Sequence, residues 1–262
     1  MTPKSNRNRV PEWHQRWLSI VTRTVRVHDE AALKPLLASM RATDSPRVLV
    51  FVNAHAMNLV ATSRRFYEST KSADLLLRDG SGMSILFKML KLQPGLNLNG
   101  TDLIPRIITL FNGQHIALFG TCEPYLDRAR EAIAQQLSPN SSVVDAHGFM
   151  DAADYLVLAQ KQHPSLIVLG MGMPKQEHVA AVLRAGLDFP CLIVCGGAII
   201  DFLGGRASRA PLWMRGLGIE WVYRFLMEPG RLFRRYVLGN PAFLTRSFLL
   251  KTAIKARSKE IS

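Results

Sequence analysis

The apolar residues between Arg47 and Asp201 are grouped in short runs rich in Leu, Val and Ile. Each run is followed by a glycine or polar residue and then by a longer segment with helical periodicity. Six runs predict β-strands, at residues 48–53, 73–80, 115–121, 142–148, 166–172 and 191–197. Consecutive apolar positions and connections long enough for a helix are typical of parallel strands covered on both faces. We therefore expect an α/β fold, with a Rossmann-like, mostly parallel sheet and helices on both faces.

Polar residues and glycines mark the ends of the predicted strands. They are Asn53, Asp79 with Gly80, Gly120 with Thr121, Asp145, His147, the run 170–172, and Gly196 with Gly197. Each of these residue types is also common in turns and helix caps, so one of them alone indicates little. Ligands of open parallel sheets bind beyond the carboxyl ends of the strands. Taken together, the set predicts a ligand site at that edge of the sheet.

The most specific local signal is LGMGMPKQE, residues 169–177. Gly170 and Gly172 allow the backbone to approach a ligand closely, and a helix beginning after them offers free N–H groups and a partial positive charge. Lys175 adds a full charge, so the segment suits a nucleotide diphosphate. A tight turn with a solvated lysine is the alternative. As a nicotinamide fingerprint the motif is weak, because Lys175 replaces the third glycine of G-x-G-x-x-G.

Two aspartates are candidates for catalysis or for binding a sugar. Asp79, in RDGSGM, is the best candidate base, because a carboxylate at a strand end can take a proton from an attacking hydroxyl. Asp-Gly is equally a common turn dipeptide. In CGGAIIDFLGG, Gly196 and Gly197 follow a strand and Asp201 precedes a Gly-rich break. Asp201 can accept a hydrogen bond from a ribose or sugar hydroxyl, or cap the next helix.

Several familiar sites are missing from the sequence. It contains no H-E-x-x-H, C-x-x-C or D-x-D spacing, and neither a phosphate-binding P-loop motif nor a G-x-S-x-G. We therefore expect no metal and no cofactor, and the kinase, ATPase and serine hydrolase classes lose support. The three cysteines, Cys122, Cys191 and Cys195, are an odd number within apolar runs, which favours reduced thiols in the cytosol. The sequence predicts neither a signal peptide nor a membrane-spanning helix.

The charge of +13 lies at the two ends of the chain. Residues 1–28 hold six basic and one acidic residue, residues 29–205 hold fifteen and sixteen, and residues 202–262 hold twelve and three. Residues 206–244 also mix arginines with Trp, Tyr, Phe and Leu. We divide the chain into a basic N-terminal segment (1–46), an α/β catalytic core (47–205) and a cationic, amphipathic, helical C-terminal appendage (206–262). Such ends indicate an anionic partner, either nucleic acid or an anionic lipid surface.

The order of seven motifs resembles that of the WecG/TagA/CpsF family of bacterial glycosyltransferases. The motifs are VNAHAMNLV, ADLLLRDGSGM, NGTDL, LFGT, LGMGMPKQE, CGGAIIDFLGG and RAPLWMRGLGIEWVYRFLMEPGRLFRRYVLGNPAFL. The resemblance covers residues 48–244. It implies an inverting, metal-independent transfer of a sugar from a UDP-sugar onto a sugar attached to undecaprenyl diphosphate, in bacterial surface polysaccharide synthesis. It also implies a peripheral protein at the cytoplasmic face of the inner membrane.

The resemblance assigns roles to individual residues. The family's general base falls on Asp79, and the asparagine of its first strand falls on Asn53. Positions associated with the nucleotide and sugar pocket fall on Gln176 and Asp201. Its C-terminal arginines, which reach the lipid diphosphate or the leaving group, fall on Arg224, Arg231 and Arg234.

Two positions depart from the family pattern. Asn97 stands where many relatives have a basic residue, and Phe51 stands where they have a hydroxyl. If the side chains at these positions contact the donor, the transferred sugar can differ from the N-acetylmannosamine type seen in some relatives.

A diphosphate-linked lipid carries charge beside an apolar tail, so a segment that meets it must be cationic and apolar together, as residues 206–244 are. The expected partners are thus a UDP-sugar, a polyprenyl-diphosphate-linked sugar and an anionic membrane surface, with no nucleic acid. The alternatives are a nucleic-acid-binding protein that uses the basic, aromatic tail and, ranked lower, an NAD-dependent oxidoreductase. Residues 13–27 fit either a second membrane contact or a strand and turn beside the core.

Overall fold

The central sheet has seven parallel strands within residues 11–260, the part of the chain that the computed structural model describes. Residues 1–10 of the predicted N-terminal segment and residues 261–262 of the predicted appendage lie outside it. The strands are β1 (Thr24–Val25), β2 (Pro46–Val52), β3 (Leu75–Arg78), β4 (His115–Gly120), β5 (Ser142–Ala146), β6 (Leu166–Gly170) and β7 (Cys191–Cys195), in the order β1-β3-β2-β7-β6-β4-β5. Five predicted strands contain an observed one and the sixth, 48–53, overlaps β2, so the Rossmann-like parallel sheet is confirmed. The two-residue β1 is too short to give an apolar run.

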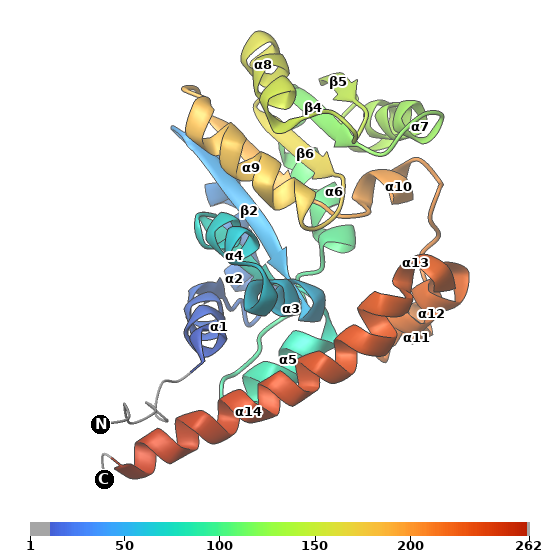
Figure 1. The fold of residues 1–262 in the computed structure, drawn as a ribbon. Helices are drawn as coiled ribbons and strands as arrows, with labels where there is room; N and C mark the ends of the chain where they lie inside the picture. Colours follow the sequence, from blue (N-terminus) through green and yellow to red (C-terminus); the bar gives the residue numbers. More distant parts are fainter. Residues whose placement is uncertain (1–10, 261–262) are drawn as a thin grey trace.

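Helices cover both faces of the sheet (Figure 1). Side chains of β2 alternate between two buried clusters, one on each face: Val48 and Val50 belong to the first, and Leu49 and Phe51 to the second. Helices α1 (Glu12–Arg23), α3 (Ala54–Thr62), α4 (Arg64–Lys71), α5 (Gly80–Met89), α8 (Ala152–Gln162) and α9 (Lys175–Gly186) add to the first cluster. Helices α2 (Glu30–Arg41), α6 (Gly100–Leu110), α7 (Tyr125–Ala132) with the π-helical turn η1 (Ile133–Leu137), and α10 (Ile199–Leu203) add to the second.

Residues 13–27, whose role the sequence leaves open, form most of α1 and the short strand β1. The side chains of Trp17 and Ile20 are fully buried, and the Trp17 indole Nε1 donates to the carbonyl of Met57 at 2.7 Å. The Trp17 ring also lies 5.4 Å from that of Phe243, between ring centroids. This segment therefore packs against the core through a helix, and Trp17 is not available to a membrane.

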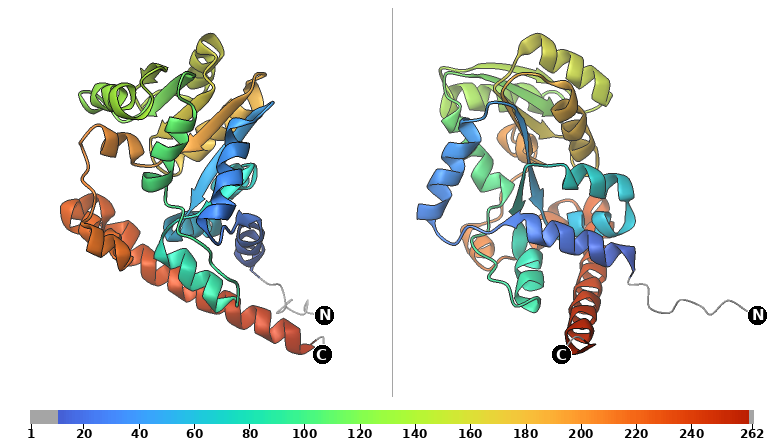
Figure 2. Two further views of the ribbon diagram at one scale, coloured as in Figure 1. Left: turned by 180° about the vertical axis from the view of Figure 1, so that it is seen from behind. Right: turned by 90° about the vertical axis from the view of Figure 1, so that its left-hand side faces the viewer.

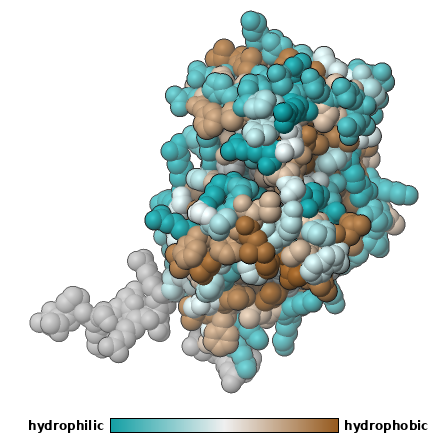
Figure 3. All heavy atoms as spheres, turned by 90° about the vertical axis from the view of Figure 1, so that its right-hand side faces the viewer, coloured by the Kyte–Doolittle hydropathy of each residue, from teal (hydrophilic) through white to brown (hydrophobic). Residues whose placement is uncertain are grey.

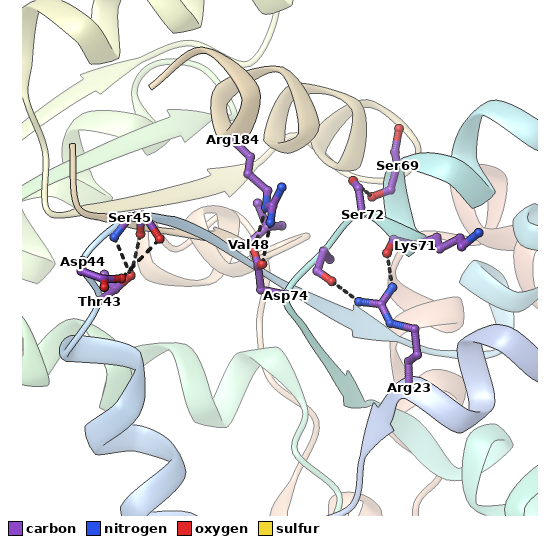
Figure 4. Close-up of polar contacts among 11 residues, drawn as sticks. Arg23, Thr43, Asp44, Ser45, Val48, Ser69, Lys71, Ser72, Asp74 and Arg184 are labelled. Atoms are coloured by element: carbon purple, nitrogen blue, oxygen red, sulfur yellow. Dashed lines mark hydrogen bonds and ion pairs between the residues drawn. The ribbon is translucent and has the colours of Figure 1, made fainter. Parts of the chain in front are cut away.

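Polar contacts tie the amino ends of the strands to the helices around them (Figure 4). The Asp74 carboxylate accepts from the N–H of Val48 at 2.8 Å and from two nitrogens of Arg184 at 2.8 Å each, which joins α9 to the start of β2 and β3. The Arg23 guanidinium donates to the carbonyls of Lys71 and Ala73. These structural contacts lie at the amino ends of β2 and β3, opposite the carboxyl edge where ligands are expected.

The C-terminal region is helical, as predicted. It comprises α11 (Leu212–Gly216), α12 (Glu220–Met227), α13 (Pro229–Phe233), the π-helical turn η2 (Arg234–Leu238) and the long helix α14 (Gly239–Glu260). Figures 1 and 2 show α14 crossing the body beside α5, with α11–α13 gathered at one end of it. Phe243 and Leu250 of α14 are buried against the core. Of the helices in the described part, none is both long and apolar enough to cross a membrane.

Candidate active site

Two cavities meet at the carboxyl edge of the sheet. The first has a volume of about 330 Å³ and lies between the ends of the strands and helices α12, α13 and η2. The second, of about 530 Å³, lies between the first turns of α3 and α5 and helices α12 and α14. Five residues line both cavities: Asn53, Asp79, Thr101, Arg224 and Arg235. Asp79 therefore stands where the two cavities join.

The Asp79 carboxylate is held at the end of β3 but does not cap a helix. The Asp79 N–H donates to the carbonyl of Val52 at 2.9 Å, which continues the pairing of β3 with β2 by one residue. Asp79 precedes α5, yet its side chain makes no capping hydrogen bond. Gly80 has φ +86°, which favours glycine, and its N–H donates to Oδ1 of Asn97 at 2.7 Å. Asn97, one of the two departures from the family pattern, thus supports the turn that carries Asp79.

The environment of Asp79 suits a base. Burial raises the pKa of its carboxyl, while a hydrogen bond from Asn53 and the charges of Arg235, Arg224 and Arg78 lower it. Asn53 donates from Nδ2 to Asp79 Oδ2 at 3.2 Å, and its Oδ1 accepts from the N–H of Ala56 at 3.1 Å. Asn53 is therefore the N-cap of α3 and orients the carboxylate at the same time.

The glycines of the predicted nucleotide turn have different roles. A Cβ on Gly170 would lie 2.6 Å from side-chain atoms of Ile200, so Gly170 allows α10 to pack on β6. Gly172 has φ +76° and open space where a Cβ would stand, and it lines the first cavity. Lys175 lines neither cavity, because its Nζ donates to the carbonyl of Gly148 at 2.9 Å. The Lys175 ammonium group therefore binds the loop of residues 147–150. It does not face the cavity, contrary to the expectation from the sequence.

The segment after β7 forms another wall of the first cavity, which Gln176, Gly196, Gly197 and Asp201 all line. The side-chain oxygen of Gln176 accepts from the N–H of Gly197 at 2.9 Å. Asp201 lies inside α10 and makes no N-cap contact. Its Oδ1 accepts from the Thr121 hydroxyl at 2.5 Å and lies 3.7 Å from Nη1 of Arg206. Thr121, one of the strand-end residues named above, and Arg206, which the sequence patterns do not single out, complete this wall.

The appendage brings arginines to the site from two helices and a π-helical turn. Arg224 of α12 and Arg231 of α13 line the first cavity, as expected. Arg234 lines neither cavity and is exposed, and Arg235 lines both. The π-helical turn that begins at Arg234 directs Arg235 inward. A spacing of three or four residues from Arg231 fits Arg234 and Arg235 alike, so the sequence does not distinguish the two.

Positive charge exceeds negative charge in the first cavity, with four arginines and two aspartates among its lining residues. Arg231 pairs with Glu228, whereas Arg224 and Arg235 form no salt bridge with any side chain that the structure describes. Burial lowers the pKa of Arg235, and the like charges of Arg224 and Arg231 lower it further, whereas Tyr236 and Asp79 raise it. An anion between Arg224 and Arg235 would relieve this repulsion. In the described part, no three His, Cys, Asp or Glu side chains are grouped to hold a metal ion.

Comparison with known proteins identifies the family of the chain. The model of the glycosyl transferase WecG/TagA/CpsF family matches residues 19–259. The N-acetylglucosaminyldiphosphoundecaprenol N-acetyl-beta-D-mannosaminyltransferase of Staphylococcus aureus strain MW2 is 29% identical over 211 residues, 79% of this chain and 82% of the relative. The same enzyme of strain NCTC 8325 / PS 47 is 28% identical over equal shares. Since the family model spans most of the sequence, the chain belongs to the WecG/TagA/CpsF family of glycosyl transferases.

Proposed function

We propose that the protein transfers a hexose or N-acetylhexosamine from a UDP-sugar to a sugar on polyprenyl diphosphate, with inversion at the anomeric carbon, in bacterial surface polysaccharide synthesis. The observation that carries the proposal is the position of Asp79 at the junction of two cavities, beside two arginines that form no salt bridge in the described part of the chain. One cavity is polar and suits a nucleotide, and the other is partly apolar. A transferase needs two substrates to meet at one base, which this junction provides.

The first cavity is the proposed donor site. Arg224, Arg231 and Arg235 offer positive charge for the diphosphate, and the N-terminus of α9 adds the partial charge of its helix dipole. The ring of Phe149 lines the cavity, lies 6.0 Å from that of His147 between centroids, and is 72% exposed, so its exposed part can stack on a uracil base. Asp201 carries an acceptor oxygen toward the ribose or sugar hydroxyls.

The second cavity is the proposed acceptor site. Near Asp79 it is lined by polar side chains, including His55, Asn97 and Asn99. Burial and the charge of Arg235 lower the pKa of His55 to about 4, so this imidazole is neutral and can hydrogen-bond to a sugar hydroxyl. Apolar side chains form the other part of the lining: Ile85, Trp221, Val237, Phe243 and Leu244. A sugar followed by an isoprenoid chain matches this change from polar to apolar.

The proposed reaction is a single displacement. Asp79 removes the proton from an acceptor hydroxyl while that oxygen forms a bond to the anomeric carbon, on the face opposite UDP. The bond from the anomeric carbon to the diphosphate oxygen breaks, and UDP leaves with the electron pair. Asn53 holds the carboxylate, and Arg224 and Arg235 stabilise the charge that grows on the leaving diphosphate.

The appendage is the proposed membrane contact, on the cytoplasmic face of the bacterial membrane. Figure 3 shows apolar side chains gathered on the lower part of the face that α11–α13 occupy. The exposed apolar residues of this region include Leu212, Trp213, Leu217, Leu226, Met227 and Phe233. Each Lys or Arg near an anionic leaflet contributes about 1 kcal/mol. Exposed apolar side chains beside arginines would therefore hold the protein reversibly at the lipid surface that carries the acceptor.

A product assay tests the proposal. The protein is incubated with a panel of UDP-sugars and a short-chain polyprenyl-diphosphate sugar, and product masses are read. We expect one UDP-sugar to add one sugar residue to the lipid, with no product from the Asp79→Asn variant. Hydrolysis of the donor without lipid product, or no reaction with any UDP-sugar while RNA binds at moderate salt, would reject the proposal.

A further inference from the structure

A buried carboxylate, that of Glu177, lies next to the first cavity and takes no part in the proposed reaction. Glu177 is in the first turn of α9 and is 1% exposed. Its Oε1 accepts from Nε2 of Gln176 at 2.8 Å, and its Oε2 has no hydrogen-bond partner in the part of the chain that is described. Burying a carboxylate with one oxygen unpaired costs free energy, which points to a role for Glu177 other than stabilising the fold.

Glu177 decides which way the amide of Gln176 points. The amide has one acceptor end and one donor end. Its oxygen accepts from the N–H of Gly197 at 2.9 Å, and its nitrogen donates to Glu177. In the flipped orientation the amide nitrogen would face the N–H of Gly197, and its oxygen would face a carboxylate. Both contacts are repulsive, so Glu177 and the N–H of Gly197 together select the orientation that is observed.

The Gln176 amide in turn fixes a turn of the backbone in the cavity wall. Gly197 has φ +63°, and the space where its Cβ would stand is open. Gly196 packs closely against Ile199, because a Cβ at position 196 would lie 2.5 Å from the Ile199 side chain. The hydrogen bond from Gly197 to Gln176 therefore sets the direction of the peptide between these two glycines, which both line the first cavity.

We propose that Glu177 is a positioning residue for the donor: through the amide of Gln176 it holds the Gly196–Gly197 turn in the shape that the donor meets. The link to the donor rests on the proposed function of the first cavity. The contact from Glu177 through Gln176 to Gly197 does not depend on it.

The ionisation of Glu177 predicts a separate, pH-dependent effect on donor binding. No salt bridge reaches it in the described part, and burial raises the pKa of its carboxyl to about 7, against the lowering effect of hydrogen bonds from Gln176 and its own N–H. The titratable group coupled to it is Cys195 of β7, whose pKa burial and Glu177 raise. The next residue of α9, His178, contacts Arg65 of α4. A donor diphosphate nearby repels ionised Glu177, so donor affinity falls as pH rises through about 7.

Two substitutions separate positioning from mere packing. Glu177→Leu removes the acceptor, and we expect the KM for the UDP-sugar to rise about tenfold while the KM for the lipid acceptor stays within about twofold. Glu177→Gln keeps an acceptor oxygen, and we expect it to restore the donor KM to within about threefold of the unmodified protein. The donor KM of this variant should no longer change with pH near 7. Unchanged donor KM in Glu177→Leu, or equal changes in both KM values, would overturn the inference.

A second measurement needs neither substrate nor activity. In the ligand-free protein, the amide resonance of Gly197 should shift with pH with a midpoint near 7, and this shift should be lost in Glu177→Gln. A Gly197 resonance that is the same in the unmodified protein and in Glu177→Gln at every pH rejects the inference even if Glu177→Leu does not fold, because Glu177 would then have no effect on the turn. If the resonance titrates but the protein binds no UDP-sugar by calorimetry, the proposed function fails and the Glu177 contact stands.

Discussion

Asn53 and Asp79 are joined by a hydrogen bond of 3.2 Å from Nδ2 to Oδ2, while Oδ1 of Asn53 caps α3. One side chain thus links the stability of a helix to the orientation of the proposed base. The two residues end neighbouring parallel strands, β2 and β3, and so reach the same edge of the sheet.

The two roles of Asn53 can be separated by Asn53→Ser. A serine hydroxyl can still cap α3 but is too short to hold Asp79 as Asn53 does, whereas Asn53→Ala loses both contacts. We expect Asn53→Ser to keep most of the unfolding free energy of the unmodified protein but to have a lower kcat. Asn53→Ala should have a lower kcat as well and should also lose about 1 kcal/mol of unfolding free energy. Urea denaturation and steady-state kinetics check this. Equal stability of the two variants would mean that the cap contributes nothing.

Asp79→Asn should abolish transfer and spare donor binding. Losing a general base costs about 100- to 10,000-fold in rate, while the amide keeps the size of the carboxylate. Product formation and calorimetric titration with UDP measure the two quantities. In the unmodified protein, the acid limb of the kcat/KM profile should lie above pH 3.8, the ordinary pKa of aspartate, because burial raises the pKa of Asp79 and the base must be ionised. A fully active Asp79→Asn would remove it from the mechanism.

The sequence predicts the sheet and most of the site for a simple physical reason. Parallel strands buried on both faces must be apolar at consecutive positions, and their carboxyl ends must lie at one edge. Asn53, Asp79, Gly172 and Gly197 therefore lie together although they are far apart in the chain.

What the sequence does not predict depends on side-chain direction and on neighbours far along the chain. The inward position of Arg235 in place of Arg234 depends on a π-helical turn, which has no simple residue signature. The direction of Lys175 depends on a carbonyl 27 residues away, that of Gly148. The need for glycine at position 170 comes from Ile200, whose approach only the folded chain reveals.

Arg235 and Arg234 form a matched pair for testing the arginine site. Arg235 lines both cavities, and Arg234 is exposed and lines neither. We expect Arg235→Ala to lower kcat/KM by about 10- to 100-fold, because a hydrogen bond to a charged group contributes about 1.5 to 3 kcal/mol. Arg234→Ala should stay within about twofold in solution assays with a short-chain acceptor. The reverse ranking of the two variants would contradict the geometry.

The exposed apolar side chains of α11 provide a test of membrane contact. Leu212 and Trp213 are 77% and 63% exposed, and Val157 of α8 is 65% exposed away from the appendage. We expect the double substitution Leu212→Ser, Trp213→Ser to reduce co-sedimentation with anionic vesicles at least about tenfold, since burying each of these side chains gives about 1.5 to 3 kcal/mol. Val157→Ser is the control and should bind as before. Equal loss in both proteins would argue against a defined contact face.

The buried carboxyl of Glu177 predicts a particular dependence of stability on pH. Its pKa is raised from 4.5 to about 7 in the folded protein, chiefly by burial. Below pH 4.5 the carboxyl is protonated whether the chain is folded or unfolded. Between pH 4.5 and 7 the unfolded chain releases the proton and the folded chain keeps it, so folding loses stability as pH rises, and above about 7 the loss is constant.

Glu177→Gln removes this titration. Its unfolding free energy, relative to that of the unmodified protein, should therefore increase by about 2 to 3 kcal/mol between pH 5 and pH 8, as measured by urea denaturation at both values. Arg234→Ala, which alters an exposed side chain, should show no such change and serves as the control. A difference between Glu177→Gln and the unmodified protein that is the same at both pH values would mean that Glu177 ionises in the folded chain as readily as in the unfolded one, as a carboxylate with access to water would.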